Sequence, residues 1–176
     1  MPRSATLPEA DLIIPNPQTT CPAVLAVDDD PAMLSTICRV LRRSKIEVQT
    51  STSGTEALKQ LGPWLPELVL LDVSMPGLSG HMFLRRFRKS EHMIHRVTGA
   101  VLPPVPVMFL TAQGGHRQRI DGLEAGAVDY LLKPFDPDEL RARVRTHLRH
   151  ARRVRQAFHS AQTNLTEPSS VSGAAA

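Results

Sequence analysis

The chain has 176 residues, of which 41% are hydrophobic and 22% are charged, a composition typical of a globular domain with its own core. No segment approaches the roughly 18 apolar residues that span a bilayer, so we expect no transmembrane helix. Acids and prolines stand where a signal peptide would be apolar, so we expect no signal peptide. Two cysteines, Cys21 and Cys38, form no CxxC motif and no disulfide framework, which favours a reducing, cytoplasmic location.

The net charge of +4 comes from one segment, because residues 141–155 contain seven arginines and no acid. Without these seven of the 21 basic residues, the other 14 face 17 acidic ones. The segment has no aromatic residue on which a base could stack. We therefore interpret the arginines as the solvated side of a helix and expect no direct contact with nucleic acid.

Strand and helix patterns alternate along the middle of the chain. Apolar or alternating runs predict five strands, in chain order residues 23–27, 46–50, 67–73, 105–111 and 127–134. Helical spacing predicts a helix after each strand, over residues 31–41, 53–61, 80–89 and 117–125, and from residue 137 onward. This order predicts an α/β fold in which helices cover both faces of a parallel, doubly wound sheet.

Capping signals support three of the helix starts. Pro31 follows Asp30, which we interpret as an N-cap that faces water, and Ser53 with Glu56 fits a capping box. Asp136 precedes Pro137 in the same way. We expect residues 1–20 to form a flexible arm, residues 21–150 the domain, and residues 151–176 a helix extension followed by a disordered tail.

The strands end on residues that carry chemistry: Asp28 and Asp29, then Asp72, Thr111 and Lys133. In a parallel sheet these ends meet at one edge, where ligands bind. Crowded carboxylates share protons or hold a cation, and Mg²⁺ prefers oxygen ligands. Together with an ammonium and a hydroxyl group, an aspartate nucleophile at this edge makes a site for a phosphoryl group.

These residues lie in motifs that resemble the receiver domain of two-component response regulators. The matching pieces, in family order, are "VLAVDDD", "LVLLDVSMPGLSG", "VMFLTA" and "GLEAGAVDYLLKPFDPDEL", and the resemblance covers about residues 22–150. It implies a flavodoxin-like sheet of five strands in the order 2-1-3-4-5. It also implies a bacterial phosphoprotein that is not an enzyme, although it has intrinsic autophosphorylation and autodephosphorylation chemistry.

The resemblance implies that Asp72 accepts a phosphoryl group from a sensor histidine kinase or a phosphotransfer protein. The cofactor would be Mg²⁺ or Mn²⁺, with Asp29 and Asp72 as direct ligands. Asp28 would hold a metal-bound water, and the backbone carbonyl of Ser74 would complete the protein's ligands.

The resemblance further implies that Lys133 pairs with Asp72 at rest and with the phosphoryl group afterwards. Thr111 would follow the phosphoryl oxygen, and Tyr130 would turn inward as Thr111 moves. The output surface would comprise the fourth helix, the fifth strand and the fifth helix. Gln113 and Ser74 occupy the positions that tune dephosphorylation in this family.

Two other functions remain open. A phosphatase of the haloacid dehalogenase type also uses an aspartate nucleophile, but it needs an acid two residues later, where this chain has Ser74. A scaffold receiver that is not phosphorylated would be expected to lack an acid, the threonine or the lysine. His92 and His95 we interpret as surface histidines, and the long segment 90–106 as tolerated loop length.

The last helix carries a seam with heptad-like spacing that continues beyond the needs of the domain. Its members are Leu140, Val144, His147, Ala151, Val154, Phe158, Ala161 and Leu165. We expect the first two to pack on the sheet and the later ones to pair in a homodimer, with a frayed amphipathic tail as the alternative. The output partner, the kinase and the stimulus are not encoded in any motif.

Overall fold

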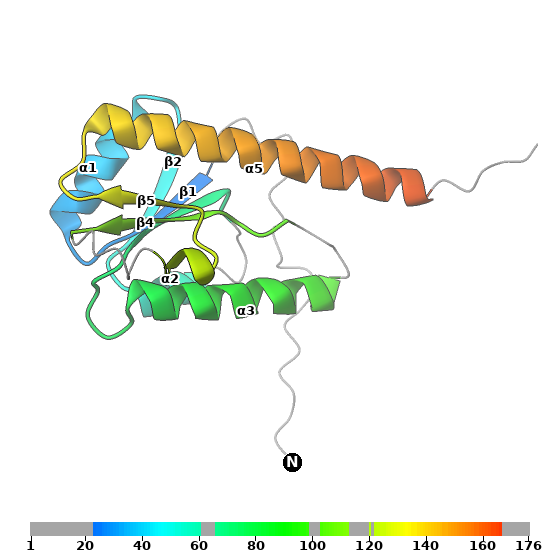
Figure 1. The fold of residues 1–176 in the computed structure, drawn as a ribbon, viewed down its shortest axis with the longest axis horizontal. Helices are drawn as coiled ribbons and strands as arrows, with labels where there is room; N and C mark the ends of the chain where they lie inside the picture. The colour runs from blue at the N-terminus through cyan, green and yellow to red at the C-terminus, as the bar shows by residue number, and fades with distance from the viewer. Residues whose placement is uncertain (1–22, 61–65, 99–102, 113–119, 121, 167–176) are drawn as a thin grey trace, which may run out of the picture.

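Five parallel strands form one sheet at the centre of the computed structural model (Figure 1), which describes residues 23–60, 66–98, 103–112, 120 and 122–166. The strands are β1 Ala23–Val27, β2 Glu47–Ser51, β3 Leu68–Asp72, β4 Val107–Thr111 and β5 Asp129–Leu132. Their order across the sheet is β2-β1-β3-β4-β5, and all four neighbouring pairs are parallel. The predicted fold class and strand order are confirmed.

Helices cover both faces of this sheet, with the strands between the two helical layers in Figure 1. They are α1 Pro31–Arg42, α2 Gly54–Gln60, α3 Gly80–Thr98 and α5 Pro137–Thr166. One buried cluster joins α1 and α5 to one face of the sheet, and a second joins α2 and α3 to the other. Alternate residues of β1 and β3 enter the two clusters, so these strands are buried on both sides and read as continuous apolar runs.

The first and last helices begin as their capping residues predict. The Asp30 side chain accepts a hydrogen bond of 2.8 Å from the Ala32 backbone N–H, and Pro31 follows it in the first turn. Asp136 accepts from the backbone N–H groups of Asp138 and Glu139 at 2.7 and 3.2 Å.

The capping box predicted for α2 forms only in part. The Ser53 hydroxyl accepts from the Glu56 backbone N–H at 3.4 Å. The Ser53 backbone N–H donates to Ser51 Oγ at 3.3 Å, and this bond replaces the expected one to the Glu56 carboxylate. The predicted end of this helix at Leu61 lies outside the described residues.

The prediction that the third helix ends near residue 89 is wrong, because α3 continues to Thr98. Part of the segment interpreted as loop length is therefore helix. The buried Glu91 carboxylate accepts from Arg88 Nη1 and from the Val105 backbone N–H, both at 2.7 Å. These bonds tie the extended helix to the segment that leads back into β4.

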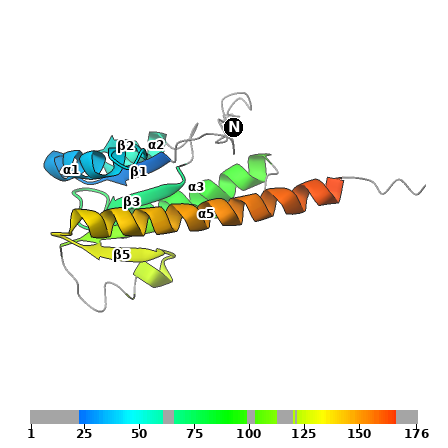
Figure 2. The same cartoon turned by 90° about the horizontal axis from the view of Figure 1, so that it is seen from above.

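Of the helix predicted over residues 117–125, the structure describes only Ile120 and the residues from Gly122 onward, which are helical as far as Glu124. The final helix is 30 residues long, and Figures 1 and 2 show its C-terminal half running past the edge of the sheet. Within the described part of the chain, no helix combines the length and the apolar character needed to cross a membrane.

Candidate functional site

The strand register brings the predicted polar residues to the carboxyl edge of the three central strands and β5. Val27 of β1 lies opposite Leu71 of β3, so the residues that follow them, Asp28 and Asp72, come to the same level. Asp72 lies opposite Leu110 of β4, which places Thr111 one residue further along. The backbone N–H of Lys133 donates to the Thr111 carbonyl oxygen at 2.8 Å, so the lysine follows β5 at this edge.

The Lys133 ammonium joins two of the carboxylates. Its Nζ donates to Asp28 Oδ2 at 2.6 Å and to Asp72 Oδ1 at 2.8 Å. Asp28 is fully buried, and Asp72 is 4% exposed. The pairing with Asp72 is the one that the resemblance implies, and the structure adds a direct bond from the same ammonium to Asp28.

The charges of Lys133, Asp28 and Asp72 do not balance. Burial raises the pKa of the Asp28 carboxyl, and its hydrogen bonds from Lys133 and from the Asp30 backbone N–H offset this effect only in part. Burial alone would lower the pKa of Lys133, but the bonds to Asp28 and Asp72 together raise it. The lysine is therefore charged at neutral pH, and a single ammonium serves two buried carboxylates.

A third carboxylate, that of Asp29, completes the cluster. Asp28, Asp29 and Asp72 each offer an oxygen atom, and these atoms lie within 4.8 Å of one another. Asp29 is exposed, so the cluster opens to solvent on one side. A hard divalent cation suits this donor set, because the ligands are all oxygens and the three carboxylates outnumber the one ammonium that bonds to them among the described residues.

Ser74 and Thr111 lie beside Asp72. The Ser74 backbone N–H donates to Asp72 Oδ2 at 3.1 Å, which holds the second carboxylate oxygen in place. Thr111 is 3% exposed at the end of β4. Gln113 lies outside the described residues.

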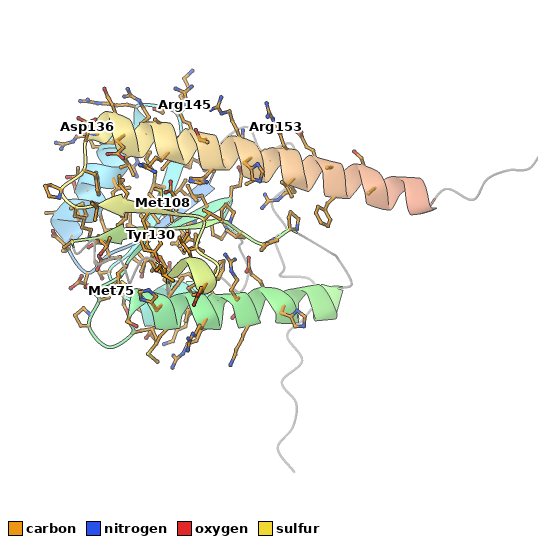
Figure 3. The ribbon with its side chains drawn as sticks, in the orientation of Figure 1. Met75, Met108, Tyr130, Asp136, Arg145 and Arg153 are labelled. Atoms are coloured by element: carbon orange, nitrogen blue, oxygen red, sulfur yellow. The ribbon has the colours of Figure 1, made fainter. Side chains whose placement is uncertain are left out.

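Tyr130 packs on β4 with its side chain half-buried (Figure 3), and its ring centroid lies 5.2 Å from that of Phe109. A Cβ atom on Gly122 would lie 1.3 Å from the Tyr130 hydroxyl oxygen and 3.1 Å from a Phe109 ring carbon. The absence of a side chain at Gly122 therefore makes room for the tyrosine. Sequence reasoning gave Gly122 and Phe109 no role in the site, because neither side chain carries a polar group.

Gly80 allows two backbone segments to lie close together. A Cβ atom there would lie 2.4 Å from the Asp72 carbonyl oxygen, so only glycine allows the start of α3 to approach the end of β3 this closely. Gly77 has a φ of 76°, a left-handed backbone conformation that favours glycine.

His147, placed on the apolar seam, instead lies in a polar cluster on the edge of the sheet. Asp129 Oδ2 lies 3.0 Å from His147 Nε2 and 2.9 Å from Arg143 Nη1. Burial alone would raise the pKa of Asp129, but bonds from His147, Arg143 and the Tyr130 backbone N–H together lower it. This cluster fastens α5 to β5.

Comparison with known proteins agrees with this geometry. The family model described as "Response regulator receiver domain" matches residues 24–145. The chain is 40% identical over 149 residues to the transcriptional regulatory protein PrrA of Mycobacterium tuberculosis, covering 85% of this chain and 58% of that protein. It is 35% identical over 136 residues to the DNA-binding dual master transcriptional regulator RpaA of Synechocystis, covering 77% and 53%.

Solved structures give the same result. A response regulator of Chloroflexus aurantiacus is 39% identical, with a TM-score of 0.62 over 73% of this chain and 98% of that one. The chemotaxis protein CheY4 of Vibrio cholerae is 26% identical, with a TM-score of 0.63 over 72% and 98%. The chain spans between about half and three fifths of the length of the curated relatives it matches. Since the family model and the relatives agree over most of the chain, it belongs to the response regulator receiver family of two-component signalling proteins.

Proposed function

We propose that this chain accepts a phosphoryl group on Asp72 from a sensor histidine kinase or a phosphotransfer protein and changes conformation in response. The observation that carries the proposal is the position of the Lys133 ammonium, 2.8 Å from Asp72 Oδ1 in a cluster of three carboxylates at the carboxyl edge of the sheet. A buried aspartate in these surroundings serves as a nucleophile toward phosphorus.

In the transfer, an Asp72 carboxylate oxygen attacks the phosphorus of a phosphohistidine. A P–O bond forms, the P–N bond breaks, and the electron pair leaves with the imidazole nitrogen, which takes a proton from solvent. The Ser74 backbone N–H orients Asp72 through Oδ2, and Lys133 stabilises negative charge as it spreads over the phosphoryl oxygens.

Asp28, Asp29 and Asp72, with the Ser74 carbonyl, would hold Mg²⁺ or Mn²⁺. When bound, the cation supplies positive charge to the transferred phosphoryl oxygens. Asp29 is the exposed member of the group and therefore faces an incoming cation. The same exposed side admits a water molecule for hydrolysis of the acyl phosphate, so we assign intrinsic autodephosphorylation to this site.

The conformational response would pass through Thr111 and Tyr130. Thr111 lies at the end of β4, and the Tyr130 ring packs beside Phe109 of the same strand. Movement of Thr111 toward the phosphoryl group would free space for Tyr130 to turn further inward, which changes the surface formed by β5 and α5. Exposed Val128 and Leu132 border that surface and suit an output partner.

The test of the phosphoacceptor role is mass spectrometry after incubation with Mg²⁺ and a small acyl phosphate. We expect one added phosphoryl group, located on Asp72 by fragmentation, and none in Asp72→Asn. Asp30→Asn is the matched control, since Asp30 belongs to the same motif but only caps α1. An adduct that persists in Asp72→Asn would contradict the proposal, and steady turnover of phosphomonoesters would favour the phosphatase.

The extended helix α5 supports a second part of the proposal, a homodimer. Leu140 and Val144 are fully buried on the sheet, as expected, whereas Phe158 is 40% exposed on the part of the helix beyond the sheet. A second copy would cover this apolar residue. Sedimentation at equilibrium with and without a phosphate analogue tests this, and a monomer in both conditions would contradict it.

A further inference from the structure

A basic groove lies between the turn that joins α1 to β2 and the middle of α5. Its volume is about 590 Å³. The residues that line the groove are Ser44, Lys45, Ile46, Ala142, Arg145, Thr146, Leu148, Arg149 and Arg152. In Figure 3 the Arg145 side chain projects from α5 away from Met108 and Tyr130, toward the outside of the molecule.

Four of the lining residues are cationic and none is acidic. Lys45 and Arg145 have no carboxylate within 4.0 Å among the residues that the structure describes. Arg149 Nη2 has only a neutral partner, Thr146 Oγ1 at 3.4 Å. Because like charges gathered on one surface repel, this arrangement favours an anion from solution.

The hydrogen bonds of Arg152 provide more specific evidence. Its Nε donates to Glu67 Oε2 at 2.9 Å, which holds the guanidinium at the rim of the groove. Its Nη2 is buried and has no hydrogen-bond partner among the described residues. Buried donors are nearly always paired in native structures, so the guanidinium of Arg152 is incompletely satisfied by the protein itself.

The sequence pattern predicts that all seven arginines of residues 141–155 lie on the solvated side of a helix. Arg141 pairs with Asp138 of the same helix, and Arg143 pairs with Asp129 and Glu139. The groove is lined instead by Arg145, Arg149 and Arg152. Lys45, which is 100 positions from Arg145 in the sequence, lines it as well.

The spacing of the cations indicates the kind of anion. Arg145, Arg149 and Arg152 follow one another at four and three positions, so at 1.5 Å per residue their Cα atoms extend over about 10 Å of the helix. A chain of phosphates can contact all three with the side chains extended, whereas a single phosphate or carboxylate group would require the three side chains to converge. Arginine also matches phosphate oxygens with paired donors.

The groove has no aromatic lining residue on which an unstacked base could lie. This argues against recognition of single strands and leaves contacts to the backbone alone. We propose that the groove binds the phosphodiester backbone of double-stranded nucleic acid without reading its sequence.

The groove is separate from the phosphoacceptor site. The α1–β2 turn precedes β2 and so lies at the amino edge of the parallel sheet, whereas Asp72 ends β3 at the carboxyl edge. Binding is therefore expected in the unphosphorylated protein and in Asp72→Asn. The duplex-binding proposal and the phosphoacceptor proposal can therefore be contradicted independently of each other.

The test is fluorescence anisotropy of a labelled DNA duplex of arbitrary sequence, titrated with the full chain at several salt concentrations. We expect binding that weakens steeply with salt, and we expect Arg145→Gln with Arg149→Gln to weaken it at least about tenfold and to reduce the salt slope by about two. The matched control is Arg85→Gln with Arg86→Gln, which removes the same charge from the exposed side of α3.

Lys45→Asn provides a second variant from a different element. Lys45 has a φ of 56°, a conformation that asparagine accepts, so this change removes charge without straining the turn. We expect a loss of duplex affinity of several fold.

Circular dichroism confirms the fold of each variant, and a polyglutamate peptide and vesicles rich in phosphatidylglycerol serve as rival anions. No duplex binding at low salt, equal losses in the groove and α3 variants, or tighter binding to either rival would overturn the proposal.

Discussion

Replacement of Lys133 by methionine tests the charge balance at the centre of the site. The ammonium bonds to Asp28 at 2.6 Å and Asp72 at 2.8 Å, and the lysine side chain is only 15% exposed. Methionine keeps much of the aliphatic volume but leaves two buried carboxylates without a cation. Removal of one partner of a buried ion pair costs about 3–5 kcal/mol, so we expect the free energy of unfolding at pH 7 to fall by this amount.

The pH dependence distinguishes lost charge from lost packing. Burial already raises the pKa of Asp28, and removal of Lys133 raises it further, so the folded variant takes up protons more readily than the unfolded chain does. The variant therefore gains stability relative to the wild type as the pH falls from 7 toward 5. Mg²⁺ has the same effect at pH 7 if it binds to the cluster, because it supplies the missing positive charge.

The assay is urea unfolding followed by circular dichroism at pH 7 and pH 5, with and without Mg²⁺. Thermal melts give a second measure, since about 3–5 kcal/mol corresponds to a Tm lower by roughly 10 °C in a domain of this size. Lys89→Met, which changes an exposed lysine on α3, is the control and is expected to remain within about 0.5 kcal/mol of the wild type. A Lys133→Met deficit equal to that of the control, or one that does not change with pH, would refute the reasoning.

Three other changes probe the surroundings of the site. Gly122→Ala places a methyl group where the Tyr130 hydroxyl lies, so we expect the free energy of unfolding in urea to fall by about 1–3 kcal/mol. We also expect a shifted ¹⁹F signal from fluorotyrosine at this sole tyrosine, and recovery of the lost stability in the double variant with Tyr130→Ala. The lowered pKa of Asp129 stabilises the fold above the ordinary value of 3.8, so the stability difference between wild type and Asp129→Asn should shrink as the pH falls below about 3.8; a constant difference down to pH 3 contradicts this. Mg²⁺ at 100 times its Kd should add about 2.7 kcal/mol to the unfolding free energy of the wild type and clearly less to that of Asp29→Ala, and equal gains would remove Asp29 from the ligand set.

The sheet could be predicted from the sequence because its strands are apolar on both faces and end on polar residues. The runs before Asp28 and Asp72 are buried throughout, so their order along the chain and their parallel direction follow from the pattern alone. The end of α3 could not be predicted in the same way. What holds the segment after α3 is the bond from the Val105 backbone N–H to Glu91, a contact across 14 residues that leaves no local signal.

Within the site, it was easier to predict which residues take part than which of them bond to one another. Strand ends brought Asp28, Asp72 and Lys133 to one edge, but only the structure shows that the lysine bonds to both acids. Gly122 illustrates a second limit, because its importance lies in the volume it leaves for Tyr130. Neither a shared ammonium nor an unfilled volume has a sequence pattern of its own.

The sharing of Lys133 has a consequence for the switch proposed above. At rest one ammonium is divided between Asp28 and Asp72, and it has no second cation beside it among the described side chains at this edge. Phosphorylation would replace the single charge on Asp72 with a phosphoryl group that carries about two, so the stronger pull on Lys133 would come from the phosphoryl oxygens. Asp28 would then lose its partner while buried, which is unfavourable unless a metal ion takes over that charge. The same carboxylate that pairs with the lysine at rest would thus make the phosphorylated state depend on Mg²⁺, and Asp28→Asn should weaken that dependence even though Asp72 remains available.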